Sequence, residues 1–289
     1  MVNETEVERS AAFYTVDLED FTFDLCRDLC SSVIPKLRTE SLFESYYNII
    51  KLLSLHKQNK PNITFFCTGV MADRYPELIK LIANDGHEIA CHGNFHDDIF
   101  SMTKKEVIQS LNTAKDKLSN VSQKEIKGFR APKFSINKND HNRLQAISEV
   151  FDYDSSLHFK SKEDYQEWRN NCTVDIKEIP VPHQPILSTK LMVKTGGSYL
   201  KLFPVSFVET AIKKSIKNNI TPIIYFHPYD IYYGYKMLAS WAELKGASSK
   251  LYWYVRQTQW AGAFNWAQKN KLTTIFSQFR NLGRLDDNL

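Results

Sequence analysis

The sequence predicts an α/β fold in which a mostly parallel sheet curls into a distorted (β/α) barrel. Short apolar stretches of strand length alternate with amphipathic helical stretches along most of the chain, a pattern typical of parallel sheets with right-handed crossovers. No internal repeat, low-complexity segment or Gly/Ser linker divides the chain. Its 289 residues, 43% of them hydrophobic, suit an α/β barrel with a sizeable core. We therefore expect residues 1–289 to form a single domain.

The predicted strands are short and rich in β-branched or aromatic residues. They cover residues 12–17, 63–68, 87–91, 126–130 and 221–227, and a last strand is expected at 272–276, where the sequence reads LTTIF. Residues 171–203 are less regular and contain a Gly-Gly pair, so we expect an irregular insertion with one or two hairpins there.

The predicted helices have apolar residues at helical spacing and recognisable ends. They cover residues 42–58, 76–85, 103–118, 139–150 and 206–217. Pro76 suits the first turn of the second helix, and a glycine follows its end. Thr103 with Glu106, and Ser206 with Glu209, have the spacing of a capping box, which predicts that each pair begins a helix.

Composition and charge argue against several functional classes. The net charge of +4, from 37 basic and 33 acidic residues, is too small and too evenly spread to indicate nucleic acid as a partner. The first ten residues lack the apolar core of a signal peptide, and no apolar run is long enough to span a bilayer. These features predict a cytoplasmic protein without an integral membrane segment and leave its oligomeric state open. Five cysteines without CxxC spacing are expected to be reduced, mostly buried thiols.

Unusual polar residues follow four of the predicted strands. The stretches are DLED at 17–20, HGNFH at 92–96, RAP at 130–132 and HPYD at 227–230. Active sites of α/β barrels lie at the carboxyl ends of the strands. Acids, histidines and an arginine from distant parts of the sequence are therefore expected to meet on one rim.

Two histidines and three acids among these residues could bind a metal ion. His92 and His96 are four residues apart, which on a helical turn would place both imidazoles on one face. Asp17, Glu19 and Asp20 crowd three carboxylates at a strand end, an arrangement that a cation would stabilise. One acid, two histidines and water make an open catalytic zinc site, and another acid can act as a base. Taken singly, surface histidines or a capped turn are commoner, so the prediction depends on their convergence.

Together these stretches resemble the polysaccharide deacetylase family (NodB homology, carbohydrate esterase family 4), in the branch whose first motif reads D-x-E-D. The matching stretches occur in the family's order: TVDLED (15–20), HGNFH (92–96), GFRAPKFS (128–135), YDSS (153–156), GGSYLKLFP (196–204) and YFHPYD (225–230). The resemblance covers residues 13–230. It implies a distorted (β/α) barrel and a catalytic domain that works as a metal-dependent carbohydrate deacetylase.

The resemblance also implies the roles of the acids and histidines. Asp17 corresponds to the catalytic base that deprotonates water, and His92 and His96 correspond to the metal-binding histidines. Glu19 fits the spacing of the acidic metal ligand, and Asp20 is the other candidate.

Three further residues match catalytic positions of the family. Arg130 corresponds to the arginine that holds the base, and Asp154 to the acid expected to pair with that arginine. His227 corresponds to the histidine that protonates the departing amine. Without this context, an arginine in a surface ion pair, an aspartate capping a loop and a core histidine would be the ordinary interpretations.

Four residues near these positions are the predicted substrate contacts. They are Pro132 and Phe134 after the arginine, and Tyr229 and Tyr232 after the last histidine. Aromatic faces stack well on the apolar faces of sugar rings, although a packed loop would have the same composition.

The sequence therefore predicts a hydrolase that removes the acetyl group from an N-acetylated sugar with the help of a divalent metal, zinc being favoured. The expected setting is a bacterial pathway for surface polysaccharide, with a free, nucleotide-linked or lipid-linked sugar as substrate. Two alternatives remain: another amidohydrolase, acting on a formamide or a cyclic amide, and a non-catalytic sugar-binding protein on the same fold. A substrate screen would separate the first alternative, and sugar binding without acetate release would indicate the second.

Overall fold

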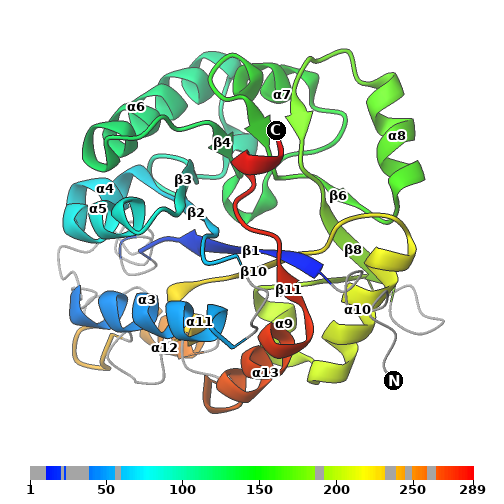
Figure 1. Ribbon diagram of the computed structural model, residues 1–289. Coiled ribbons are helices and arrows are strands. Elements are labelled where there is room, and N and C mark those ends of the chain that lie inside the picture. Colours follow the sequence, from blue (N-terminus) through cyan, green and yellow to red (C-terminus); the bar gives the residue numbers. More distant parts are fainter. Residues whose placement is uncertain are drawn as a thin grey trace.

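The computed structural model describes residues 11–20, 23, 39–55, 60–185, 192–231, 239–244, 249–258 and 265–289. Its main sheet has eight strands: β1 (Ala11–Leu18), β2 (Thr64–Cys67), β3 (Glu88–Cys91), β4 (Gly128–Phe129), β5 (Tyr153–Asp154), β7 (Lys177–Glu178), β10 (Ile223–Phe226) and β11 (Arg280–Asn281). Their order is β10-β1-β2-β3-β4-β5-β7, with β11 also on β1, and every pair is parallel. The sheet curls and is covered by helices (Figure 1), which confirms the predicted distorted (β/α) barrel.

The alternation of side chains along β1 separates the inside of the curled sheet from the helix-covered outside. Tyr14 and Val16 belong to the large core between sheet and helices, whereas Phe13 belongs to a smaller cluster inside the curl. Because successive strand residues point to opposite faces, Thr15 and Asp17 share the inner face with Phe13. The first predicted catalytic acid therefore lies at the carboxyl end of the central strand, pointing into the barrel.

The helices confirm most of the sequence-based boundaries to within a few residues. The capping box of Thr103 and Glu106 is present, Pro76 occupies the first turn of its helix, and Gly86 follows with φ +84°. The helices are α3 (Thr39–Leu53), α4 (Gly69–Arg74), α5 (Pro76–Asn84), α6 (Lys104–Ser122), α7 (His141–Ser148), α8 (Lys162–Asn171), α9 (Ser198–Leu202), α10 (Val205–Lys217), α11 (Pro228–Ile231), α12 (Lys250–Gln257) and α13 (Asn265–Gln278).

Two local predictions are wrong. The stretch 272–276, predicted as the last strand, lies inside α13. Leu272, Ile275, Phe276 and Phe279 are all buried, and their i, i+3, i+4, i+7 spacing is that of one helical face. The capping box predicted at Ser206 does not form either, because α10 already begins at residue 205 after Pro204.

The region from 171 to 203 combines an edge of the main sheet with a small second sheet. β7 extends the main sheet beside β5. The second sheet consists of β6 (His158–Phe159), β8 (Val181–Pro185) and β9 (Met192–Lys194), with β6 parallel and β9 antiparallel to β8. The β8–β9 pair is a hairpin of the kind predicted for this region. Figure 1 shows β6 and β8 beside α8 and α10.

Two predictions about the whole chain can be compared with the described part. None of the helices described is both long and apolar enough to cross a membrane. Cys67 and Cys91 are free and buried, and Cys172 is free and partly buried. Cys26 and Cys30 lie outside the described residues.

Candidate active site

Glu19, His92 and His96 bring three ligand atoms together at the carboxyl edge of the sheet. Their donor atoms all lie within 4.8 Å of one another, and all three residues are buried. Glu19 Oε2 lies 2.6 Å from His96 Nε2 and 3.9 Å from His92 Nε2. Two imidazoles and one carboxylate, leaving room for water, are a donor set that suits a divalent metal ion.

The two histidines lie on a loop after β3, and not on the helical turn that their spacing suggested. Gly93 has φ +78° and His96 has φ +56°, so the chain reverses within this loop. The N–H of Gly69, at the start of α4, bonds to the carbonyl of Gly93 at 2.9 Å. This left-handed turn places the two imidazoles beside each other, as a helical turn would do, so both can bind the same ion.

Hydrogen bonding and charge prepare these side chains for a cation. The Nδ1 atom of His92 is 2.9 Å from the carbonyl oxygen of Arg130, so it carries the proton and leaves Nε2 free to bind. Burial lowers the pKa of His92 to about 4, which keeps the ring neutral as a ligand must be. Burial raises the pKa of Glu19, but the neighbouring His96, His227 and His92 outweigh it and hold that pKa well below its usual range.

Asp20, the alternative acidic ligand, points elsewhere. Its Oδ2 lies 3.2 Å from Arg74 Nε and accepts a 3.2 Å hydrogen bond from the hydroxyl of Tyr75. It also accepts from the backbone N–H of Phe23. Asp20 is absent from the group of ligand atoms around the two histidines within the described residues.

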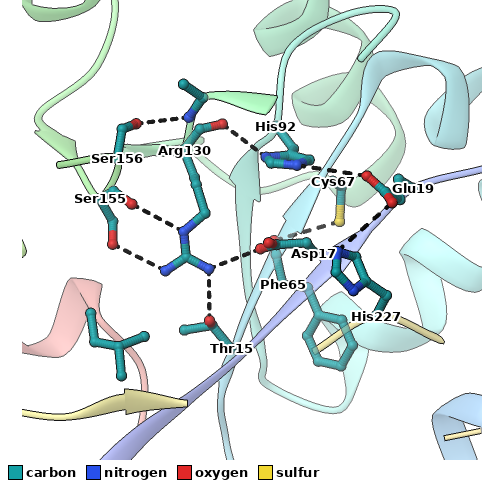
Figure 2. Close-up of polar contacts among 12 residues, drawn as sticks. Thr15, Asp17, Glu19, Phe65, Cys67, His92, Arg130, Ser155, Ser156 and His227 are labelled. Atoms are coloured by element: carbon teal, nitrogen blue, oxygen red, sulfur yellow. Dashed lines mark hydrogen bonds and ion pairs between the residues drawn. The ribbon is translucent and has the colours of Figure 1, made fainter. Parts of the chain in front are cut away.

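Arg130 holds Asp17 from within the barrel. Arg130 Nη1 donates to Asp17 Oδ1 at 2.8 Å and to Thr15 Oγ1 at 2.8 Å. Its Nε and Nη2 donate to the carbonyl and the hydroxyl of Ser155, both at 3.1 Å, and its guanidinium lies 4.0 Å from the ring centre of Phe66. Figure 2 shows these bonds converging on a side chain that is fully buried. The expected contact between Arg130 and Asp17 is therefore present, with four of the five N–H groups of the guanidinium engaged.

The expected direct pairing of Asp154 with Arg130 does not form between these two described residues. Asp154 lies opposite Phe129 in the sheet register, and Phe129 belongs to the core outside the curl. Arg130, one residue later, points inward, so the alternation of the strands separates the two charges. Asp154 accepts instead from the Ser156 hydroxyl, which in turn accepts from the N–H of Ala131 at 2.7 Å. Asp154 thus supports the backbone beside the arginine.

His227 faces the same space from the end of β10. Its Nε2 lies 3.8 Å from Glu19 Oε1, and its ring stacks on Tyr229 at 4.7 Å between ring centres. Burial lowers the pKa of His227, but the carboxylates of Glu19 and Asp230 outweigh burial and raise it to about 9. These two carboxylates thus favour the imidazolium, the form that a proton donor requires.

Three residues that the sequence analysis did not assign support these groups. Asp230 Oδ2 is 2.9 Å from Nδ1 of His227 and accepts from that residue's N–H, while Lys201 Nζ lies 3.1 Å from Asp230 Oδ1. The H-P-x-D spacing at the start of α11 is the sequence feature that could have indicated Asp230 as the partner of His227. Glu178, opposite Asp154 in the sheet, is the third, and nothing in the local sequence distinguishes it.

The predicted substrate residues have different surroundings. Pro132 is buried beside Gly93, and Phe134 is partly buried against Tyr225 at 5.2 Å between ring centres. Tyr229 donates its hydroxyl to Glu19 Oε1 at 2.8 Å, so it also orients a candidate ligand. Tyr232 lies outside the described residues.

Comparisons with known families and proteins agree with this geometry. The profile of the polysaccharide deacetylase family matches residues 43–148, and that of a domain of unknown function, DUF3473, matches residues 156–268. The peptidoglycan deacetylase of Helicobacter pylori is 28% identical over 119 residues, which are 41% of this chain and 40% of that protein. A peptidoglycan-N-acetylglucosamine deacetylase of Bacillus cereus is 29% identical over 89 residues, or 31% of this chain and 32% of that protein. The chain thus spans less than half the length of these curated relatives.

Solved structures show the same fold. The crystal structure of a putative polysaccharide deacetylase from Mycobacterium smegmatis superposes with a TM-score of 0.53 and 16% identity, over 95% of both chains. A mutant of a CE4 family pseudoenzyme with restored enzymatic activity superposes with a TM-score of 0.50 and 12% identity, over 96% of this chain and 66% of that one.

Proposed function

Because the chain belongs to the polysaccharide deacetylase family, we propose that it is a metal-dependent hydrolase that removes the acetyl group from an N-acetylated sugar. The observation that carries this proposal is the meeting of a ligand group, a carboxylate held by an arginine and a protonated histidine on one rim. Asp17 and Glu19, His92, and His227 come from three stretches far apart in the sequence, and Figure 2 shows their side chains around one space.

The donor set favours zinc as the resident ion. Glu19, His92 and His96 would hold it, since two neutral imidazoles and a carboxylate are typical zinc ligands, and Asp20 is already engaged by Arg74. An ion bound there supplies Lewis-acid polarisation of the acetyl carbonyl and makes nearby water more acidic.

The side chains divide the proton transfers between them. Asp17, held by Arg130, which also donates to Thr15, takes a proton from the water that attacks the acetyl carbonyl carbon. As the carbon–nitrogen bond breaks, His227 gives its proton to the departing nitrogen, and acetate and a free amine result. Asp230 holds the ring of His227 so that Nε2 faces the reaction.

The substrate is an N-acetylated sugar of a bacterial surface polymer or of its precursor. The names of the relatives, which act on peptidoglycan, support this class, and the branch of the family that the first motif resembles supports a surface-polysaccharide precursor. Base, ligand group and acid are all present, which favours catalysis over sugar binding alone. The cytoplasmic location and the single catalytic domain stay predictions.

Acetate release tests the proposal. Purified protein loaded with zinc, and the same protein after chelation, would be supplied with N-acetylglucosamine in free, nucleotide-linked and oligomeric forms. We expect acetate and a free amine in equal amounts from at least one of them, only with metal and not from Asp17→Asn. Hydrolysis of a formamide or cyclic amide alone would support another amidohydrolase, and sugar binding without any turnover would support a binding protein.

A further inference from the structure

Three basic side chains gather on one face of the small sheet, outside the site described above. His183 on β8 lies opposite Lys194 on β9, so both side chains project from the same face. The ring of His158, on β6, lies 5.8 Å from that of His183 and 4.6 Å from that of Phe134. Lys194 Nζ lies 4.5 Å from the centre of the same Phe134 ring.

No carboxylate balances this cluster within the described part of the chain. Lys194 contacts the ring of Phe134 and forms no ion pair with any residue that the structure describes. Burial lowers the pKa of Lys194 to about 8. Among the described residues, Asp164 is the acid whose charge acts on His183, and it already pairs with Lys138 at 3.2 Å. Residues 186–191, between β8 and β9, have the sequence ILSTKL and contain no acid. A largely buried cation without a counter-charge is unfavourable and is typical of a binding site.

His158 has an unused ring nitrogen. Its Nδ1 lies 3.2 Å from the carbonyl oxygen of Val181 and donates to it, whereas Nε2 is buried and has no partner among the described residues. Burial lowers the pKa of His158 well below its usual range, and Lys194, His183 and Arg130 lower it further, while the Val181 carbonyl acts in the opposite direction. An anion arriving beside Nε2 reverses that balance, so His158 takes up a proton and donates it in a hydrogen bond.

We propose that Lys194, His158 and His183 bind a phosphate group carried by the sugar substrate. A phosphate offers several acceptor oxygens to the ammonium group and to both imidazoles, and its negative charge balances the basic groups around it. This inference rests on the proposed function, because it takes the phosphate and the reacting acetamide to belong to one molecule. Sugars linked through phosphate to a nucleoside or to a lipid share this chemistry.

The position of the cluster suits such a substrate. Phe134 touches His158 on one side and Tyr225 on the other, and the ring of Tyr225 lies 6.5 Å from that of His227. The two aromatic rings thus lie between the basic cluster and the reaction centre. Phe134, which is partly exposed, provides a surface for the sugar ring, with the acetamide directed to the reaction centre and the phosphate to Lys194.

Binding by calorimetry tests the inference without requiring turnover. The ligands are N-acetylglucosamine, its 1-phosphate, and the same sugar carrying a nucleoside diphosphate or a short isoprenyl diphosphate. We expect the 1-phosphate to bind the wild type more tightly than the neutral sugar, with proton uptake. Lys194→Met should reduce that preference about tenfold or more, since a charge-assisted hydrogen bond is lost. Lys194→Arg should keep part of the preference, and Lys104→Met, which removes a lysine paired with Glu149, should keep all of it.

Thermal unfolding gives a second measurement. Lys194→Met should unfold at a higher temperature than the wild type without ligand, because it removes an unbalanced buried charge, and it should gain less on adding the 1-phosphate. Equal affinity of the wild type for the neutral sugar and the 1-phosphate would overturn the inference, as would equal binding of an N-acetylated uronic acid. Preference for one diphosphate identifies the natural carrier. Lys194-dependent binding without acetate release would contradict the proposed function and leave this site in place.

Discussion

Asp154 and Glu178 face each other across two neighbouring parallel strands, both almost fully buried. Asp154 Oδ1 accepts from Ser156, and Glu178 Oε1 accepts from the N–H of Leu157 at 2.9 Å. Their other oxygens, Asp154 Oδ2 and Glu178 Oε2, have no hydrogen-bond partner among the described residues. Burial, and after it the charge of Asp154, raises the pKa of Glu178 well above its usual range. Two ionised carboxylates that face each other in a buried site repel, so we expect the pair to hold one proton between them.

Glu178→Gln should keep the fold, because a neutral amide donates to Asp154 as the protonated acid does. Glu178→Ala leaves the N–H of Leu157 and the Asp154 carboxylate without partners, and we expect it to cost about 1–3 kcal/mol in the free energy of unfolding. Urea unfolding measures both. Equal losses in the two variants would contradict the shared proton.

The same pair predicts how stability depends on pH. Burial, the largest effect, raises the pKa of both carboxyl groups in the folded protein. Above the ordinary carboxyl range the folded state therefore binds more protons than the unfolded state, and stability falls as pH rises. Glu178→Gln should make this fall shallower above the ordinary carboxyl range, whereas the exposed Glu125→Gln should not. Parallel curves for wild type and Glu178→Gln would argue against the pair as their source.

The metal ligands can be identified by metal analysis. His92→Ala, His96→Ala and Glu19→Ala should each lose stoichiometric metal together with activity, because each removes a ligand. Asp20→Asn should keep the metal, since Asp20 is engaged by Arg74 and Tyr75. Full metal content in Glu19→Ala, with loss in Asp20→Asn, would reverse the assignment.

Asp17→Asn should keep fold and metal but lose about 10²–10⁴ in turnover, as expected for a general base. The amide has nearly the same shape and still accepts from Arg130, but it cannot take the proton of water. The loss should be similar for an N-acetyl sugar and for an aryl acetate, because both need attack by water. Metal content measured in the same preparation shows that the loss is not due to an empty site.

His227→Ala should impair the N-acetyl sugar far more than the aryl acetate, because an amine must be protonated to leave and a phenolate need not be. Comparison of kcat for the two substrates measures this difference. Equal losses on both would indicate that His227 stabilises the oxyanion or orients the base.

Asp230→Asn should shift the pH profile through His227. The Asp230 carboxylate, after Glu19, raises the pKa of His227 against the effect of burial. Only the imidazolium can donate a proton, so kcat falls as pH rises through that pKa, and removing the charge of Asp230 should move this fall to lower pH. An unchanged alkaline limb would leave Asp230 with a structural role alone.

Much of the fold was predictable because its signals are local. Strand-length apolar runs, the capping box at Thr103 and the Pro76 helix start depend on neighbours within a few residues, and they appear where expected. The prediction for residues 272–276 failed because so short an apolar-rich run fits both the two-residue period of a strand and the 3.6-residue period of a helix. Packing of the whole buried face of α13 favours the helix.

For the site, the sequence by itself determined which chemical groups are available: two histidines at fixed spacing, clustered acids, an arginine and a late histidine. The tertiary structure decided how they pair. It turned Asp20 towards Arg74 and Glu19 towards the histidines, and strand alternation separated Asp154 from Arg130. It also brought Glu178 to Asp154, which no local pattern indicates. The direction of a side chain depends on sheet register and on neighbours distant in sequence, and only the folded chain provides these.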